Sequence, residues 1–426
     1  MIFFNLCKCL FIGSLIKYNL YNEKLIKILL KTIHKCGIIP VKMLQWILPP
    51  LKAMDTDKKI LNIFENVYEK CPNHNIEYTE QIYKLDFYDD ISTEYEILDI
   101  IGSGSIAQVY KIRDKSSDKF YAMKVKHPNV KKQFNIINYY LKIIFSIISF
   151  NKIIPVNLND FLIQFKLQLN FVNEGNNLLK FGELYKNNIL YKIPNVYKLS
   201  KNIIIMDYIE ADTIEKFSDN NIKYSKYNLE IFIFSNNNLF VNNFNHGDLH
   251  NYNWKITNDK KIVIYDFGLC WEMKDNTLIN IFNELLDGFH TKDMNVVYSS
   301  FKRFIMYDSN IEEYIIKTYF NDHMKNVNRF MDISKHLLLF GTKYNITLDV
   351  NLLYIIVSWQ NTLLIFMRNY NDKRDVFEIN NLRSEEYNIC DYYDILPEYR
   401  IFLKNQILNY NKNDDIDYDN LRKFIK

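Results

Sequence analysis

The sequence predicts an α+β fold with two lobes, in which a small mixed lobe built on a β-sheet precedes a larger helical lobe. Three stretches have the apolar content and the short length of strands: 95–101, 121–125 and 203–206. Helical spacing of apolar residues occupies residues 1–90 before these strands and residues 134–180 between them. From residue 225 onward the spacing is mostly helical, although residues 261–265 are typical of a short buried strand. This order of elements places the main sheet in the first lobe.

Changes of pattern divide the 426 residues into five segments. An apolar and basic helical segment comes first, and a helical extension, the small lobe, the helical lobe and a polar tail follow it. Their bounds are 1–36, 37–94, 95–210, 211–410 and 411–426. We expect helix breaks at Gly37, Pro40 and Pro49–Pro50, and a further helix over residues 56–70. With 48% hydrophobic residues, a chain of this length can bury two lobes.

Composition narrows the classes of function. The net charge of +3 is nearly balanced, so we expect no nucleic-acid partner. The six cysteines have no metal-ligand spacing, which is typical of a reducing compartment. Residues 3–16 are apolar but too short and too interrupted to span a bilayer, and no later stretch is long and uncharged enough. The first arginine is Arg113, so an Arg-rich transit peptide is not evident.

The first 52 residues are strongly basic, with eight lysines and one acidic residue. Four of the lysines recur at helical spacing: Lys24, Lys27, Lys31 and Lys35. Leucine and isoleucine residues fill another face of the same helix. Such a basic amphipathic helix fits an anionic lipid or membrane surface, and it equally fits a helix whose apolar face packs against the body of the protein. The sequence leaves both alternatives open.

Asp248, Asn253 and Asp266 have the spacing of a phosphotransfer site. The first aspartate lies in the stretch His246-Gly-Asp-Leu-His-Asn-Tyr-Asn253, and the second precedes Phe-Gly directly after the predicted strand 261–265. In phosphotransferases of the protein-kinase type, one carboxylate orients or deprotonates the acceptor hydroxyl, while an amide and a second carboxylate hold Mg²⁺ on the ATP phosphates. We therefore expect Asp248 to be catalytic and Asn253 and Asp266 to bind the metal.

The other half of such a site is expected upstream. The stretch Gly102-Ser103-Gly104-Ser105 lies between two predicted strands, where backbone N–H groups can close over phosphate oxygens. A plain hairpin turn is the alternative explanation of its glycines. Lys124 on the following strand is expected to contact the α- and β-phosphates, and Glu174 to pair with it from a helix. The packed face predicted for this helix comprises Leu167, Phe171 and Leu178. The alternative for Glu174 is an ordinary surface position on that helix.

The strand 203–206 ends at the expected connection between the lobes. There the backbone groups of Asp207 and Ile209 are expected to bond the edge of adenine, and a plain strand end is the alternative. His246 and His250 have the spacing of zinc ligands, but the asparagine and the Asp-Phe-Gly stretch that follow favour another role. We expect His246 to brace the catalytic loop, and His250 to be structural or close to the phosphates.

Together these residues resemble the UbiB family of atypical aarF-domain kinases, which is linked to ubiquinone metabolism. The motifs that carry the likeness are Gly102–Val109, Ala122–Val130, Gln168–Glu174, His246–Asn253 and Asp266–Cys270. The resemblance implies a bilobal protein-kinase-like fold, ATP and Mg²⁺ as cofactors, and an N-terminal helical extension over the active site. A mitochondrial location would follow from the resemblance alone.

The family also carries a Lys-x-Gly-Gln motif on that extension. Lys42 and Gln45 lie where this motif is expected, with Leu44 at the position of its glycine. By the resemblance, Lys42 and Gln45 reach the nucleotide cleft, and two polar residues on an ordinary helix are the alternative. The catalytic loop departs from the family at three positions, where Pro, Pro and Gly are usual: Leu249, Asn251 and Tyr252.

The sequence therefore predicts an atypical kinase or ATPase that binds Mg-ATP and acts with a lipid or membrane-associated acceptor. A small-molecule kinase of the aminoglycoside or choline kinase type is the nearest alternative, because it shares the His-Gly-Asp-Leu-His stretch. A non-catalytic ATP-binding regulator is a further alternative. A conventional protein kinase fits less well, since no Ala-Pro-Glu segment follows Asp266-Phe-Gly.

Overall fold

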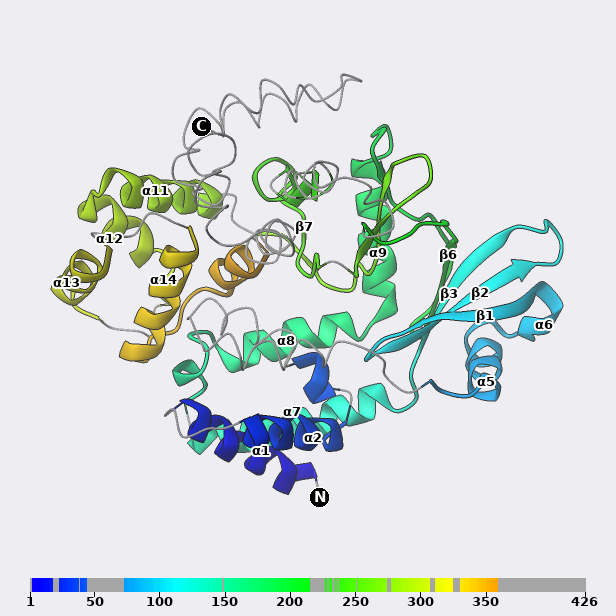
Figure 1. Cartoon of the computed structure of the whole chain (residues 1–426), viewed down its shortest axis with the longest axis horizontal. Coiled ribbons are helices and arrows are strands. Elements are labelled where there is room, and N and C mark those ends of the chain that lie inside the picture. Colours follow the sequence, from blue (N-terminus) through cyan, green and yellow to red (C-terminus); the bar gives the residue numbers. More distant parts are fainter. Residues whose placement is uncertain are drawn as a thin grey trace. The chain divides into compact units, whose positions relative to one another are not determined.

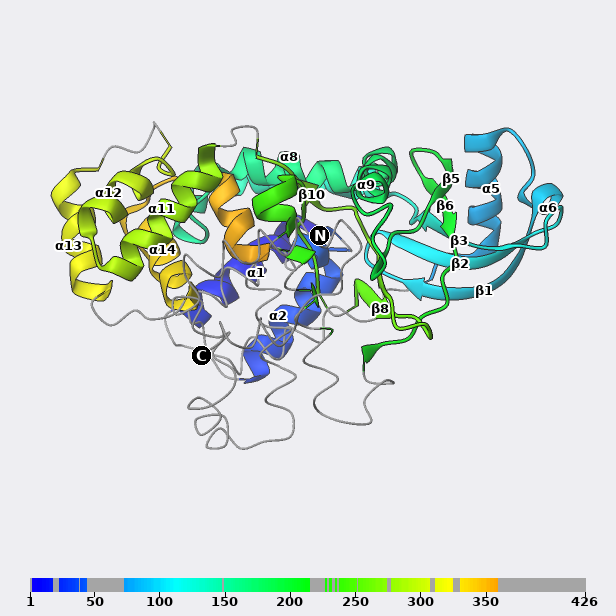
Figure 2. The ribbon, with the colours of Figure 1, turned by 90° about the horizontal axis from the view of Figure 1, so that it is seen from above.

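The computed structural model describes most of the chain up to residue 358 (Figures 1 and 2). The described residues are 2–17, 23–37, 39–43, 73–147, 149–214, 227, 230–231, 234–235, 237–250, 252–273, 277–306, 311–324 and 330–358. The predicted helix 56–70, the break at Pro49–Pro50, Gln45 and the tail 411–426 lie outside them. The chain divides into two compact units. The first comprises Met1–Ile153, Leu158–Leu179 and Pro194–Tyr208, and the second comprises Ile154–Asn157, Lys180–Ile193 and Ile209–Lys426.

Helices from the start of the chain pack together in the first unit. α1 (Ile2–Lys17) and α2 (Glu23–Lys35) lie against each other, and α7 (Val130–Ile147) lies beside α1 (Figure 1). Gly37 follows α2 with a φ of 104°, a conformation that favours glycine, so the predicted break there is confirmed. The break expected at Pro40 is wrong. Pro40 lies in the first turn of the helical residues 39–43. N–H groups in a first turn have no acceptor within the helix, so the N–H that proline lacks is not needed there.

The first unit is built on a five-stranded sheet. Its strands, in spatial order, are β1 (Tyr95–Ser103), β2 (Ala107–Asp114), β3 (Phe120–Lys126), β6 (Ile203–Asp207) and β5 (Val196–Leu199). Every pair of neighbouring strands is antiparallel, which leaves β1 and β5 as the edges. The three predicted strands are confirmed as β1, β3 and β6. Because β3 and β6 lie inside the sheet, the residues on them are held from both sides.

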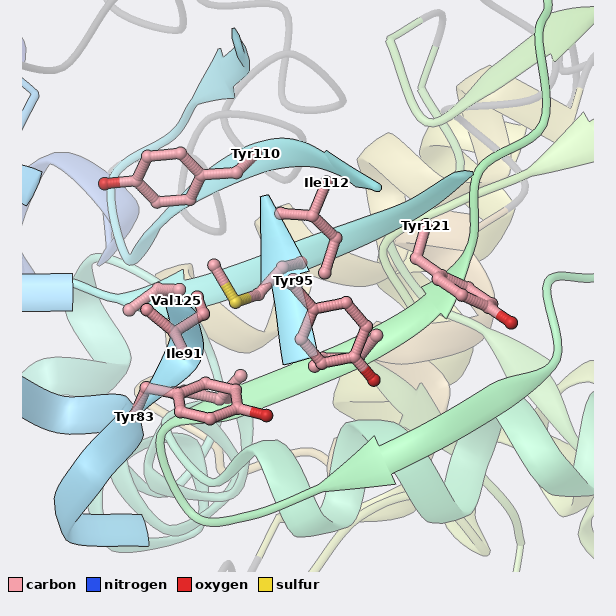
Figure 3. Close-up of a cluster of buried hydrophobic side chains, with 10 residues drawn as sticks. Tyr83, Ile91, Tyr95, Tyr110, Ile112, Tyr121 and Val125 are labelled. Carbon is pink, nitrogen blue, oxygen red and sulfur yellow. The ribbon is translucent and has the colours of Figure 1, made fainter. Parts of the chain in front are cut away.

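Two helices cover one face of this sheet, α5 (Ile76–Phe87) and α6 (Ile91–Glu94) (Figures 1 and 3). A cluster of buried side chains joins them to it: Tyr83, Ile91, Tyr95, Tyr110, Ile112, Tyr121, Met123, Val125, Ile203 and Ile205. Alternate residues of β3 enter this cluster, as expected for a pleated strand with one face on a core. Asn75 caps α5 by accepting the N–H of Tyr78 at 3.2 Å. The packing fixes β3 for the residues on its other face.

The helix predicted to carry Glu174 begins later than expected. α8 (Leu158–Gln168) ends before it, and α9 (Phe171–Leu184) starts only after Asn170. The side chain of Asn170 accepts the N–H of Val172 at 3.2 Å, as an N-cap residue does. Phe171 and Leu178 are buried as predicted. Leu167 is 46% exposed, contrary to the prediction, because it lies on the last turn of α8 and not on the helix of Glu174.

The second unit contains two small sheets. One is formed by β4 (Tyr191–Lys192), β9 (Ile262–Ile264) and β8 (Trp254–Ile256), and the other by β7 (Asn245–His246) and β10 (Cys270–Trp271). β4 and β9 run parallel, and the other two pairs are antiparallel. The predicted strand 261–265 is confirmed as β9. All five strands are only two or three residues long, so side-chain packing around them must hold the loops that they connect.

Helices make up most of the remaining described part of the second unit. They are α11 (Thr277–Thr291), α12 (Met294–Lys302), α13 (Glu313–Met324), α14 (Phe330–Tyr344) and a helix over residues 350–358. Two shorter helical segments occur elsewhere, a 3₁₀ turn (Phe150–Lys152) and a π-helical turn (Asn238–Asn242). Rings of Phe301, Phe320 and Phe340 pack between α12, α13 and α14. No helix within the described ranges is long and apolar enough to cross a membrane.

Candidate active site

The glycine-rich turn joins β1 to β2 in the first unit. The N–H of Gly104 donates to the carbonyl of Ala107 at 2.9 Å and closes the turn. A Cβ atom added at Gly102 would meet no described atom within 4 Å, and one at Gly104 would meet the Ala107 carbonyl at 3.9 Å. Neither glycine has a positive φ. The fold of the described residues therefore does not require glycine at either position, whereas the close approach of a ligand to the backbone would.

Lys124 lies in the middle of β3, opposite Val109 of β2 and Ile204 of β6. Its Nζ lies 2.6 Å from Oε1 of Glu174, in the first turn of α9. The two side chains are 12% and 2% exposed, so the ion pair is largely removed from water. The predicted pairing of these two residues is confirmed. In such a place each charge stabilises the other, and neither is well tolerated alone.

The start of α9 fits closely against the sheet. Phe171 is fully buried, and its ring centroid lies 5.4 Å from Nζ of Lys124. A Cβ atom added at Gly175 would lie 2.5 Å from the methyl carbons of Leu199 on β5. Glycine at this position therefore lets α9 approach the sheet, and the approach brings Glu174 within reach of β3.

Asp207 and Ile209 lie at the end of β6, as expected. The carboxylate of Asp207 accepts the backbone N–H and the amide of Asn195, at 2.9 and 2.7 Å, and the hydroxyl of Tyr197 at 2.7 Å. The carbonyl of Ile209 accepts the hydroxyl of Tyr265 at 3.3 Å. These bonds fix the backbone at the strand end, and the contact of Asp207 and Ile209 with adenine stays a prediction.

Lys42 is 8% exposed and lies on the helical residues 39–43 of the first unit. Burial of a lysine requires compensation of its charge, which an ordinary surface position would not need. Its predicted partner in the motif, Gln45, lies outside the described residues. The role of Lys42 toward a nucleotide stays a prediction.

In the second unit, two loops carry the remaining predicted residues. Residues 247–253 connect β7 to β8, and residues 265–269 connect β9 to β10. The pairing of β7 with β10 and of β8 with β9 holds both loops at both ends. The N–H of Tyr265 also donates to the carbonyl of Asn253 at 2.8 Å. The two loops therefore lie side by side, as the spacing of Asp248, Asn253 and Asp266 predicts.

His246 braces these loops. Its Nε2 lies 3.1 Å from the carbonyl oxygen of Tyr265 and so carries a hydrogen, while its Nδ1 accepts the N–H of Asp248 at 3.3 Å. Burial lowers the pKa of His246, which keeps the ring neutral at pH 7, as this pattern of bonds requires. The predicted bracing role is confirmed. Both ring nitrogens of His246 are engaged within the protein, which leaves neither for a zinc ion.

Asn253 and Asp266 are oriented by their surroundings. Asn253 is buried, and its amide nitrogen donates to the carbonyl of Asp248 at 2.7 Å, which directs the amide oxygen elsewhere. Asp266 has a φ of 54°, a left-handed conformation that few residues other than glycine adopt. Phe267 is fully buried beside it, with its ring centroid 5.1 Å from that of His246. The packing of Phe267 holds Asp266 in a conformation that costs on the order of 1 kcal/mol, as is common at functional sites.

The carboxylate of Asp248 is 16% exposed, and Nε2 of His250 lies 3.8 Å from its Oδ1. The side chain of Asp248 is thus only slightly more exposed than that of Lys124, at 12%. The preceding Gly247 is needed for close packing, since a Cβ atom there would lie 2.8 Å from Cγ of Leu269 and 3.1 Å from Cδ1 of Trp271. This contact keeps the loop of Asp248 against the segment that follows Asp266.

A family model described as the ABC1 atypical kinase-like domain matches residues 66–301, more than half of the chain. The chain belongs to this ABC1 family. The resemblance drawn from the motifs is thereby confirmed, because ABC1 and aarF-domain proteins are one kinase-like family. The α+β fold predicted for it, with an antiparallel sheet followed by a mostly helical region, is also confirmed.

Several ABC1 and aarF-domain proteins are similar to this chain. An uncharacterized chloroplastic aarF-domain protein kinase of Arabidopsis thaliana is 26% identical over 210 residues, which cover 47% of this chain and 28% of the relative. A probable serine/threonine-protein kinase of Dictyostelium discoideum, abkB, is 28% identical over 249 residues, which cover 52% of this chain and 35% of the relative. The chain thus spans about a third of the length of these relatives. The solved structure of Rv3197 with erythromycin, from Mycobacterium tuberculosis, aligns at 13% identity with a TM-score of 0.47 and covers 68% of this chain and 80% of that chain.

Some residues of the candidate site are not among those predicted. Gly175 and Gly247 lie where a side chain would clash with a neighbouring residue. In the sequence, only the adjacent Glu174 and Asp248 mark these segments as part of a site. β2 itself is absent from the predicted strands, although its residues alternate between buried and partly exposed from Val109 to Arg113. His127 and Gln108 are polar residues that lie buried beside the glycine-rich turn. Nothing in their spacing distinguishes them from solvated residues of a strand.

Proposed function

We propose that this ABC1-family chain binds Mg-ATP and either hydrolyses it or transfers its terminal phosphoryl group. The observation that carries the proposal is the buried ion pair between Lys124 and Glu174, at 2.6 Å. A lysine and a glutamate with 12% and 2% exposure gain little stability from each other in a protein interior, where apolar residues of similar size serve as well. Protein kinases use the same pair to hold the lysine against the α- and β-phosphates.

The glycine-rich turn supports the binding of a phosphate group. The hydroxyl of Ser103 is buried, and among the described residues no group hydrogen-bonds with it. A phosphate oxygen is an acceptor that would satisfy this donor. The open space beside Gly102 allows phosphate oxygens to approach the backbone N–H groups of the turn. The residues Gly102–Ser105 therefore fit the phosphates of a nucleoside triphosphate, and Lys124 supplies a positive charge to balance them.

The loops of the second unit support the catalytic half. Asn253 and Asp266 offer an amide oxygen and a carboxylate, the hard oxygen ligands that Mg²⁺ prefers. When bound, Mg²⁺ supplies charge neutralisation on the phosphates. Asp248 is a partly exposed carboxylate on the same pair of loops, and we assign it the task of orienting or deprotonating the acceptor hydroxyl or water. His246 holds the loop of Asp248 and stays neutral while it does so.

For the acceptor we propose a lipid or a membrane-associated molecule. The four lysines of α2 are all exposed, whereas Ile26, Leu29 and Ile33 on its apolar face are buried, so α2 itself packs inside the protein. α1, which lies against α2, exposes large aromatic side chains, with Phe4 71% and Phe11 64% exposed. Exposed aromatic rings on α1 and exposed lysines on the neighbouring α2 fit an anionic membrane surface.

The test is ATP turnover with and without liposomes that contain anionic lipids. We expect Mg-dependent hydrolysis that Asp266→Asn abolishes and that anionic liposomes increase. A magnesium-dependent increase in melting temperature with ATP should disappear in Lys124→Ala. Nucleotide binding without turnover under either condition would leave a non-catalytic ATP-binding regulator. Turnover only with a soluble amino or hydroxyl compound would instead favour a small-molecule kinase.

A further inference from the structure

Beside the glycine-rich turn lies a chain of polar side chains that the proposed phosphate chemistry does not use. His127 follows β3 and is 6% exposed. Its Nε2 lies 3.0 Å from the carbonyl oxygen of Gly104, and its Nδ1 lies 2.7 Å from Nδ1 of His74. The backbone N–H of His127 donates to the carbonyl of Ile106 at 2.8 Å. His127 thus touches the turn at two points, and His74 touches His127 from the segment that leads into α5.

The chain continues beyond His74. Nε2 of His74 lies 2.9 Å from Oγ1 of Thr79 on α5, and that hydroxyl lies 2.7 Å from the hydroxyl of Tyr110 on β2. Nε2 of Gln108 donates to the same Tyr110 hydroxyl at 2.6 Å, and Oε1 of Gln108 accepts the backbone N–H of His74 at 2.9 Å. The series of bonds therefore returns to His74. Through His74 and His127, one network joins α5, β2 and the turn.

The partners fix the direction of every bond. A carbonyl only accepts, so Nε2 of His127 carries a hydrogen, and in a neutral ring its Nδ1 then accepts from Nδ1 of His74. Nε2 of His74 is then an acceptor for the hydroxyl of Thr79, which in turn accepts from Tyr110. The hydroxyl of Tyr110 accepts from Gln108. Every donor meets an acceptor only if both histidines are neutral.

Burial supports this assignment. It lowers the pKa of His74 to about 4, with a further contribution from His127, and it lowers the pKa of His127 as well. The groups that face the two rings are uncharged: Tyr78 and Thr79 of α5, Gln108 and Tyr110 of β2, and the Gly104 carbonyl. At pH 7 both rings are neutral, and the network is complete.

We propose that His127, seated by His74, is a positioning residue that fixes the Gly102–Ser105 turn in the conformation that receives phosphate oxygens. The proposal rests on the nucleotide site proposed above. Gly102 and Gly104 leave the backbone of the turn free to move, and ordering it on binding would lower affinity. The hydrogen bond from His127 to Gly104 removes that freedom beforehand. Its loss should weaken nucleotide binding by about tenfold, as expected for one lost buried hydrogen bond.

Two substitutions at one position separate this role from simple packing. His127→Gln places an amide nitrogen near the position of Nε2 and keeps a donor for Gly104. His127→Asn places its amide near the position of Nδ1, so it keeps a partner for His74 and loses the bond to Gly104. The matched control is His323→Gln, on the exposed face of α13 in the second unit.

The primary readout is hydrogen exchange of the backbone amides of residues 102–107 without nucleotide. The second readout is the dissociation constant for Mg-ATP. We expect His127→Asn to exchange faster over this turn and to bind about tenfold more weakly. The control should match the parent protein in both measurements, and His127→Gln, which loses only the bond to His74, should stay much closer to it than His127→Asn does. Equal exchange and equal affinity in the Asn and Gln variants would overturn the positioning role.

The exchange measurement does not depend on nucleotide, so the two proposals fail separately. If the parent protein binds no nucleotide, the proposed function fails, while the comparison of exchange between Asn and Gln still decides the role of His127. If His127→Asn does not fold, His74→Gln provides the milder test, because His74 lies on an accessible segment and its loss leaves Nδ1 of His127 without its donor. Faster exchange at residues 102–107 is expected there too, and unchanged exchange would overturn the proposal.

Discussion

Lys124 lies on a five-stranded sheet and meets Glu174 of α9, and the two side chains are 12% and 2% exposed. Asp248 and Asp266 instead lie on loops between strands of two or three residues. In the first unit the charged groups already satisfy each other at 2.6 Å. In the second unit the side chain of Asp248 is 16% exposed, and Asp266 is held in a left-handed conformation. The first unit therefore holds its charges as a closed pair, whereas the second unit carries its aspartates on loops that backbone hydrogen bonds fix.

This difference has a consequence for substitution. A change in the closed pair leaves a charge in a buried place, so it should act on folding as well as on binding. An aspartate-to-asparagine change in the loops removes a proposed ligand and leaves no opposite charge buried, so it should act mainly on turnover. Measurements of stability and of turnover on the same variants therefore test this difference between the two units.

The largest effect is expected at Asp266. Asp266→Asn keeps the size of the side chain and removes the charge that we assign to Mg²⁺, so ATP turnover should fall by about a thousandfold or more. Stability should change by less than about 1 kcal/mol, since asparagine tolerates the left-handed conformation as aspartate does. Steady-state phosphate release and urea unfolding measure the two quantities. Asp322→Asn, on the exposed side of α13, is the control and should change neither. A large loss of stability in Asp266→Asn would show that the second unit is also a closed arrangement.

Lys124→Ala should cost about 3–5 kcal/mol of unfolding free energy, because Glu174 at 2% exposure loses a counter-charge. Replacement of both residues by apolar ones of similar size, Lys124→Met with Glu174→Leu, should recover most of that loss. Nucleotide binding should be absent from both proteins. The double variant thus separates stability from function, and its recovery of nucleotide affinity would contradict the assignment of Lys124 to the phosphates.

The sequence predicts the side chains with proposed chemical roles better than it predicts the residues that hold them in place. Asp248, Asn253 and Asp266 are recognisable because phosphotransfer needs those side chains at that spacing, and Lys124 and Glu174 because the motif order places them. Gly175 and His127 escape prediction since their roles depend on contacts with Leu199 and Gly104, which only the folded chain brings close. The wrong expectation for Leu167 has a similar cause. Helical spacing runs through Asn170, and only the N-cap bond of its side chain ends one helix and begins the next.

Two glycines offer a smaller and sharper contrast between the units. Gly247→Ala would place a Cβ atom 2.8 Å from Leu269, and overpacking of this kind costs about 1–3 kcal/mol. Gly102→Ala would meet no described atom within 4 Å, so its stability should stay within about 0.5 kcal/mol of the parent protein or rise slightly. Its nucleotide affinity should nevertheless fall, because the Cβ atom enters the space assigned to the phosphates. Urea unfolding and Mg-ATP titration of both variants provide the test, and a destabilised Gly102→Ala with unchanged affinity would contradict it.

The smallest effect is expected at an exposed ion pair of the second unit. Lys180 lies 2.5 Å from Glu272, and their side chains are 48% and 55% exposed. Nζ of Lys180 also lies 3.9 Å from the ring centroid of Phe244, so Lys180→Ala should cost about 1 kcal/mol, and Glu272→Gln less. Salt provides the decisive measurement. Raising the ionic strength from 0.05 to 1 M, a range chosen to shorten the screening length to about 3 Å, should shrink the effect of Glu272→Gln and leave that of Lys124→Ala nearly unchanged. Equal sensitivity to salt would mean that water reaches the Lys124–Glu174 pair as freely as it reaches the surface, and the description of that pair as closed would then fail.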